Sequence, residues 1–260
     1  MWSNKILIAV LSATIVILLL IIAMVIVILA ARRQNIQQQL NEAVYKNKLN
    51  DIALASLKAQ MNPHFIFNCL NSIKLYTEQN NSAAASLYLS KFSKLIRNML
   101  DNARSEKTIL ASEIETLRLY LDMEAMRFKE KMSYEIIVHK NLDTDFIEIP
   151  PLLIQPYVEN AIWHGIMHKA GNGKVTIKIE ETDGDKLVIT VEDNGVGRVK
   201  ASSLKNNASE HKSHGTQITN DRIALFNERY KSNASVIITD LYDSENVPSG
   251  TLVTINLSAV

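Results

Sequence analysis

The sequence predicts a protein of the α+β class, with helices in its first half and a mixture of strands and helices in its second. Apolar residues before residue 132 recur at steps of three and four, which is typical of helices. After that point, short segments alternate apolar and polar residues, which indicates strands. Because these strands and helices follow no regular strand-helix-strand order, we expect a two-layer domain with helices on one face of a sheet.

The first element is an uncharged apolar segment, residues 6–31, rich in Ile, Leu and Val. It is longer than the roughly 20 residues that a helix needs to cross a bilayer, so a transmembrane helix is predicted. The alternative, a cleaved signal peptide, has a shorter apolar stretch of about 7–15 residues. Arg32 and Arg33 follow the segment, against Lys5 before it, which places the rest of the chain in the cytoplasm.

Overall composition argues against two classes of protein. The 28 Lys and Arg residues nearly balance 27 Asp and Glu residues, so the net charge of +1 gives no indication of nucleic acid as a partner. Cys69 is the only cysteine, which excludes an intrachain disulfide and fits a reducing cytoplasmic location.

Three helices are expected after the apolar segment. Residues 32–58 are polar with a sparse apolar stripe, which predicts a coiled-coil-like linker in a parallel dimer, although one amphipathic helix packed on its own domain would look similar. A helix over 82–103 should form a hairpin with the helix before it. Ser112 and Glu115 have capping-box spacing, which predicts a third helix from there to about Lys131.

The second half of the chain contains five predicted strands and two predicted helices. Two of the strands are close enough in sequence to form a hairpin around Asp183 and Gly184. The expected elements are a strand over 133–139, a helix over 152–167, strands over 174–180 and 186–192, a helix over 219–230, and strands over 234–240 and 250–257.

A histidine follows a proline in the segment from Asn62 to Asn68. Pro63 should interrupt the helix, so that His64 lies near a first turn. A neutral imidazole is a competent nucleophile near pH 7. Taken alone, however, a helical histidine such as His64 is more often a structural residue than a catalytic one.

Two further motifs suggest a nucleotide site. Glu159 and Asn160 place a carboxylate beside an amide, and both offer the hard oxygen ligands that Mg²⁺ prefers, although a solvated helix edge would look the same. Asp193 ends a predicted strand and can accept a hydrogen bond from an exocyclic amine. Gly195 and Gly197 follow it and allow close approach of a ligand, although such a tripeptide is also a common turn.

The last motifs lie near the C-terminus. Gly215 and Thr216 come shortly before a predicted helix, where backbone N–H groups can bind phosphate. The polar stretch 200–213 before them resembles a mobile lid, or equally a plain surface loop. Thr251 opens the last predicted strand.

The order of these motifs resembles the LytS/YehU family of bacterial sensor histidine kinases over about residues 55–257. The resemblance implies the Bergerat (GHKL) ATP-binding fold, which uses ATP with Mg²⁺ and has no GxxxxGK[ST] phosphate loop, and none occurs here. The motifs that carry it are Asn62 to Asn68, Tyr120 to Phe128, Glu159 to Gly165, Asp193 to Gly197, Gly215-Thr216 and Gly250-Thr251.

The resemblance also implies roles for individual residues. His64 would accept the γ-phosphoryl group, Glu159 would orient a water near the metal, and Asn160 would coordinate Mg²⁺. Asp193 would bind the adenine amine. The remaining roles are a loop turn beside the nucleotide for Gly195 and Gly197, a lid hinge for Gly215, and pocket lining for Thr216 and Thr251.

Two positions depart from common histidine kinase patterns. The lid motif continues as Gln217 and Ile218 and lacks the second glycine of the usual G-x-G-L form. Phe65 follows His64 where other families carry an acidic residue, so the general base is unassigned. Asn68 lies one helical turn after His64, and as a hypothesis it positions a water for dephosphorylation of the regulator.

These observations together predict four regions and a membrane-anchored sensor histidine kinase of a two-component system. The chain would form a homodimer in the bacterial inner membrane, phosphorylate His64 and transfer the phosphoryl group to an aspartate of a response regulator, of the LytTR type by resemblance. The alternatives are an ATP-hydrolysing conformational machine and an inactive membrane adaptor that kept the fold. The four regions are the transmembrane helix 6–31, the linker 32–58, the phosphoacceptor and dimerisation region 59–131 and the ATP-binding domain 132–260.

Overall fold

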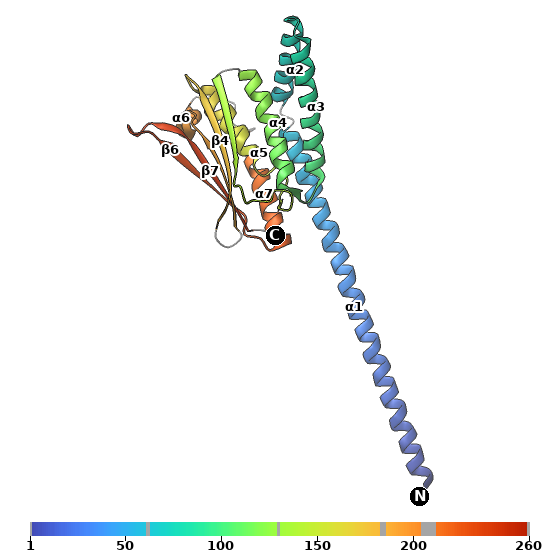
Figure 1. Ribbon diagram of the computed structural model, residues 1–260. Coiled ribbons are helices and arrows are strands. Elements are labelled where there is room, and N and C mark those ends of the chain that lie inside the picture. Colours follow the sequence, from blue (N-terminus) through green and yellow to red (C-terminus); the bar gives the residue numbers. More distant parts are fainter. Residues whose placement is uncertain (1, 61–62, 129–130, 183–185, 204–211, 259–260) are drawn as a thin grey trace. The chain divides into compact units, whose positions relative to one another are not determined.

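The computed structural model describes the chain except residues 1, 61–62, 129–130, 183–185, 204–211 and 259–260 (Figure 1). The side chains of several adjoining residues, among them 52–64 and 202–216, also lie outside the described set. The chain divides into two units, residues 1–48 and 49–260, and each is considered by itself.

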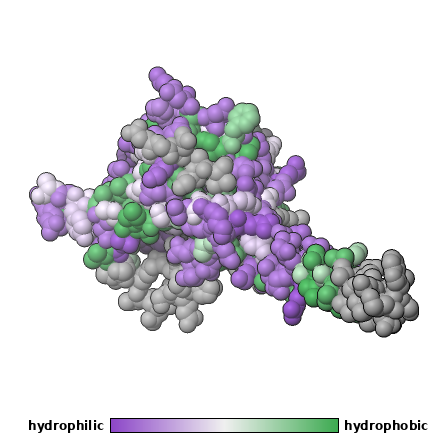
Figure 2. Space-filling view, turned by 90° about the horizontal axis from the view of Figure 1, so that it is seen from below, coloured by the Kyte–Doolittle hydropathy of each residue, from purple (hydrophilic) through white to green (hydrophobic). Residues whose placement is uncertain are grey.

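The first unit is part of one long helix, α1 (Trp2–Gln60). Large apolar side chains from Leu18 to Leu29 are exposed along it, and Figure 2 shows this apolar stretch in green. Within the described residues, the stretch Leu18–Asp51 is long and apolar enough to cross a membrane, a test that a signal sequence near the N-terminus would also pass.

The second unit begins with a helical hairpin. After α1 ends at Gln60, α2 (Pro63–Glu78) starts at the proline, which is a favourable first helical residue because its missing N–H needs no partner. α3 (Ser82–Arg104) confirms the helix predicted over 82–103, and the Asn81 side chain caps it by accepting the N–H of Ala84. The hairpin partner of α3 is α2, not the helix that precedes Pro63, which corrects the prediction.

The next helix, α4 (Leu110–Phe128), begins two residues before the predicted start, so the capping box at Ser112 is wrong. Strand β1 (Thr108–Ile109) leads into it and pairs with β3 (Glu148–Ile149). The N–H groups of Leu110 and Ala111 donate to the carbonyls of Ile147 and Thr144 at 2.8 and 3.0 Å. Because loop carbonyls already satisfy these first N–H groups, the helix needs no side-chain cap there.

A five-stranded sheet forms the second layer, and all five predicted strands are confirmed. β2 runs parallel to β4, whereas the other neighbours are antiparallel. Side chains of β4 and β5 alternate between buried and exposed, and α4, α5 and α7 cover the buried face (Figure 1), which confirms the α+β class and the two-layer arrangement. In spatial order the strands are β2 (Met132–Val138), β4 (Gly173–Thr182), β5 (Lys186–Asp193), β7 (Pro248–Ser258) and β6 (Ser235–Tyr242).

The helix predicted over 152–167 is shorter and less regular than expected. It begins as α5 (Gln155–Asn160), widens into a π turn, η2 (Ala161–Gly165), and closes as a 3-10 turn, η3 (Ile166–His168). α6 (Gly197–Ser203) occupies the start of the predicted lid, of which 204–211 lie outside the described residues. α7 (Lys212–Tyr230) begins earlier than the helix predicted over 219–230.

Candidate functional site

The loop before α5 is fixed by two buried charged residues. The Glu113 carboxylate in α4 accepts the N–H groups of Leu152 and Ile154 at 2.9 and 3.1 Å. The Arg222 guanidinium in α7 donates to the carbonyl of Pro151. Leu152 has φ +57°, a left-handed conformation that a residue within an α-helix does not adopt. The predicted helix therefore cannot include Leu152, and it starts only at Gln155.

Asp193 is the centre of the candidate site, at the end of β5. Its side chain is 4% exposed, and Oδ1 accepts the N–H of Gly195 at 2.8 Å. Thr251, its partner in the β5–β7 register, donates a hydroxyl hydrogen bond to it. Burial raises the pKa of Asp193 to about 6, although these two hydrogen bonds oppose the shift. The structure therefore brings Asp193, Gly195 and Thr251 into direct contact.

Gly165, at the end of η2, packs against the same carboxylate. Its carbonyl accepts the N–H of Val196 at 3.2 Å. A Cβ at Gly165 would lie 2.5 Å from Asp193 Oδ1, and one at Gly195 would lie 2.3 Å from the Gly165 backbone. Sequence reasoning assigned no role to Gly165, although its place at the end of the Glu159 motif was a signal. The close packing of Gly165 against Asp193 and Gly195 thus holds the helix of Glu159 and Asn160 against the turn that follows Asp193.

The turn after Asp193 is also tied to the neighbouring strand. The Asn194 side chain accepts the backbone N–H of Lys174 at 2.7 Å, and its carbonyl accepts from Lys169 Nζ at 2.5 Å. Gly197 follows with φ +74° and opens α6. These bonds fix the edge of the site where the sheet meets α6.

Glu159 and Asn160 end α5, and the π turn that follows leads to Gly165. Gln155 Nε2 donates to Glu159 Oε1 at 2.9 Å. Burial raises the pKa of Glu159 to about 7; the Gln155 bond lowers it, and the negative Glu124 raises it further. The carboxyl group therefore titrates near neutral pH, as acid–base groups of active sites often do.

Three predicted site residues fall where side chains are not described. His64 lies in the first turn of α2, as the proline predicted. Gly215 and Thr216 lie in the first turns of α7. The roles expected of these three residues therefore stay predictions.

An aromatic junction connects α2 with the helix of Glu159. The ring of Tyr120 in α4 lies 5.4 Å from the ring of Phe65 in α2, measured between centroids. Trp163 Nε1 donates to the Tyr120 hydroxyl at 3.1 Å. Arg127 lies with its guanidinium carbon 4.5 Å above the Trp163 ring and forms an ion pair with Glu124. Sequence reasoning assigned none of these contacts.

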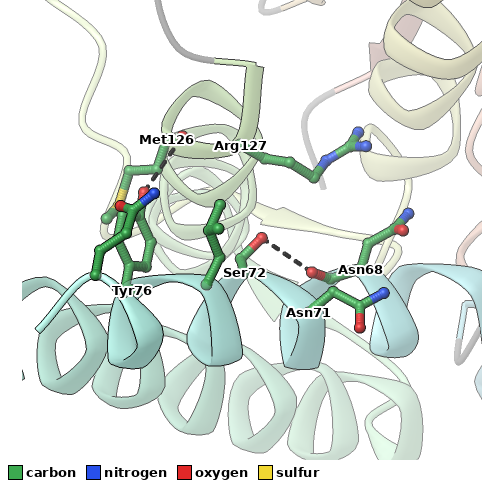
Figure 3. A pocket seen from close by; sticks show the side chains of 8 residues that line it. Asn68, Asn71, Ser72, Tyr76, Met126 and Arg127 are labelled. Carbon is green, nitrogen blue, oxygen red and sulfur yellow. Dashed lines mark hydrogen bonds between the residues drawn. The ribbon is translucent and has the colours of Figure 1, made fainter. Parts of the chain in front are cut away.

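A cavity of about 280 Å³ opens beside α2 near the end of α4. Figure 3 shows Asn68, Asn71 and Ser72 from α2 on one side and Arg127 on the other. The Ser72 hydroxyl donates to the carbonyl of Asn68 at 2.9 Å, and Tyr76 donates to the carbonyl of Met126 at 3.4 Å. Asn68 thus lines a hollow large enough for several waters, one helical turn after His64.

Comparisons with known proteins find similarity to sensor histidine kinases. Residues 52–132 match the histidine kinase family model. The chain is 34% identical to the sensor protein LytS of Staphylococcus haemolyticus over 162 residues, which is 62% of this chain and 27% of that protein. It is 36% identical to the sensor histidine kinase BtsS of Escherichia coli K12 over 151 residues, 57% of this chain and 26% of that protein.

The matched regions span about a quarter of the length of these relatives. Among solved structures, the histidine kinase domain of the blue-light activated kinase of Erythrobacter litoralis EL346 aligns with a TM-score of 0.41 and 13% identity, over 84% of this chain and 96% of that one.

Proposed function

We infer that this chain is a member of the LytS/YehU family of sensor histidine kinases and an ATP-dependent kinase that phosphorylates its own His64. The observation that carries the proposal is the contact of Asp193, Gly195, Gly165 and Thr251 at the end of β5. A buried carboxylate supported by a backbone N–H and a hydroxyl is suited to accept the amine of adenine.

The residues beside Asp193 fit a magnesium nucleotide. Glu159 and Asn160 supply oxygen atoms from the end of α5, and Mg²⁺ is held in proteins by few such ligands together with waters and phosphates. We propose that Asn160 coordinates the metal and that Glu159 orients a water beside it. The metal would neutralise charge on the phosphates. Gly197, Gly215, Thr216 and Thr251 would border the nucleotide.

The transfer step requires alignment more than covalent assistance. A neutral nitrogen of His64 forms the new bond to the γ-phosphorus, the bond to the bridging oxygen breaks, and ADP leaves with the electron pair. The phosphoryl group would then pass to an aspartate of a response regulator, as in two-component systems. Residues 59–131 would be the phosphoacceptor and dimerisation region, and 132–260 the ATP-binding domain.

We further propose that residues 6–31 anchor the chain in the bacterial inner membrane. Exposed apolar side chains from Leu18 to Leu29 support this, because bilayer lipid would cover them. The linker 32–58 would extend the dimer from the membrane to the hairpin. The regulator is proposed to be of the LytTR type, as the sequence resemblance implies.

Labelling with γ-labelled ATP and Mg²⁺ tests the proposal on the full chain in membranes, beside His64→Ala, Asn160→Ala and the matched control His139→Ala. Label that is acid-labile and alkali-stable is expected in the wild type and in His139→Ala, whose exposed side chain lies beyond β2. It should be absent from the other two variants. An unlabelled wild type that still binds ATP would overturn the kinase proposal in favour of an adaptor.

A further inference from the structure

We propose that Tyr120 is a positioning residue for phosphoryl transfer, setting the turn that contains His64 against the helix that carries Glu159 and Asn160. The inference rests on the proposed kinase function. Tyr120 lies in the middle of α4, is 2% exposed, and contacts residues from both helices.

On one side, Tyr120 restrains the first turn of α2. Its ring lies 5.4 Å from that of Phe65, which is 6% exposed and directly follows His64. A helix has 3.6 residues per turn, so consecutive positions are about 100° apart around its axis. A buried Phe65 therefore fixes the rotation of this turn of the helix about its axis.

On the other side, Tyr120 restrains the segment after α5. Its hydroxyl accepts the Trp163 indole N–H at 3.1 Å. Trp163 lies one helical turn after Glu159, and the Arg127 guanidinium covers its ring at 4.5 Å. Glu124 holds Arg127 through an ion pair within α4. The indole is thus fixed by two residues of α4, one through a directional bond and one by stacking.

The hydroxyl group distinguishes positioning from simple packing. A phenylalanine at position 120 would keep the ring contact with Phe65 and most of the buried apolar surface. It would lose the hydroxyl oxygen that accepts the Trp163 N–H. Phe65 would still pack against residue 120, but Trp163 would no longer be hydrogen-bonded to that residue. Because hydrogen bonds weaken steeply with misalignment, this bond constrains orientation more strongly than an apolar contact does.

The test compares Tyr120→Phe, Trp163→Phe and the double variant as full chains, measuring labelling rate against ATP concentration and ATP binding. Tyr120→Phe is expected to slow labelling at saturating ATP by roughly three- to tenfold, with KM for ATP unchanged. The double variant should be no slower than Trp163→Phe alone, because the two changes remove one bond.

Tyr134→Phe is the matched control, since its phenol bonds to Asp122 in the same helix but outside the junction, and it should label at the wild-type rate. An unchanged or faster rate in Tyr120→Phe, an equal loss in Tyr134→Phe, or additive effects in the double variant would overturn the inference alone. An unlabelled wild type would overturn the kinase proposal and this inference with it.

Discussion

Glu113 and Arg222 bind the two sides of one peptide group, between Pro151 and Leu152, in the loop that leads into α5, although one lies in α4 and the other in α7. Both are buried, so each charge compensates the other. Burial raises the pKa of Glu113, and its backbone hydrogen bonds and the charge of Arg222 lower it. Two elements far apart in sequence thus determine where the helix of Glu159 and Asn160 begins.

Replacing Glu113 with Gln should therefore destabilise the protein. The amide would direct an N–H₂ group at a backbone N–H and leave Arg222 without a buried counter-charge, so the free energy of unfolding should fall by roughly 2–4 kcal/mol. Denaturant unfolding measures this. Glu115→Gln, in an exposed ion pair with Lys94, is the control and should cost less than about 1 kcal/mol. Equal effects in the two variants would contradict the expectation.

Gly195→Ala should abolish ATP binding. The new Cβ would lie 2.3 Å from the Gly165 backbone and 2.6 Å from Asp193 Oδ1, so the turn must open and the carboxylate must move. Gly171→Ala is the matched control, because no described atom lies within 4 Å of a Cβ there. Fluorescence titration with a nucleotide analogue measures both. Wild-type affinity in Gly195→Ala would show that the close approach is unimportant.

The sequence was sufficient to predict the five strands of the large sheet and the approximate place of most helices, because their periodicity is local. Pro63 predicted the start of α2, and alternating residues predicted β4 and β5. The start of α4 was wrong, since Leu110 and Ala111 find acceptors in a loop more than thirty residues later, a tertiary contact that no capping pattern contains.

Part of the candidate site was also predictable, and the remainder depended on packing. Asp193 and Gly195 stand two residues apart, so their contact follows from a local turn. Gly165 and Tyr120 gain their importance from chain segments that meet only in the folded state. Burial, which the sequence does not record, decides the pKa of Asp193 and of Glu159.

ATP affinity should fall as the pH is lowered through about 6. The Asp193 pKa is raised to about 6 by burial, and only the ionised carboxylate accepts strongly from an adenine amine. Below that pH, affinity should fall by up to about tenfold per unit. The stability of the nucleotide-free protein depends on pH with the opposite sign. Because the pKa of Asp193 is higher in the folded state, this group stabilises the folded state at low pH, and that contribution is lost as the pH rises from about 4 to about 6.

Calorimetric titration with nucleotide between pH 5 and 8 would measure this dependence. Asp193→Asn is the informative variant, since the amide oxygen can still accept the Gly195 N–H while the titrating charge is gone. It should bind weakly and without the pH dependence. A wild-type affinity that is constant down to pH 5 would show that Asp193 does not bind the nucleotide in its ionised form.

The labelling rate at saturating ATP should rise with pH through about 7. Burial raises the Glu159 pKa to about 7, and the ionised form is the one able to orient a water beside the metal. Gln155→Leu removes the N–H donor that stabilises this carboxylate, so the inflection of the rate profile should move to higher pH.

Two further variants serve as controls. The labelling rate of Glu159→Gln should be low and nearly independent of pH, whereas Glu180→Gln, on an exposed position of β4, should keep the wild-type profile. Rate profiles between pH 6 and 9 would measure this. If the rate profile of Gln155→Leu has its inflection at the same pH as the wild type, a group other than Glu159 titrates, because loss of the Gln155 donor must raise the pKa of Glu159.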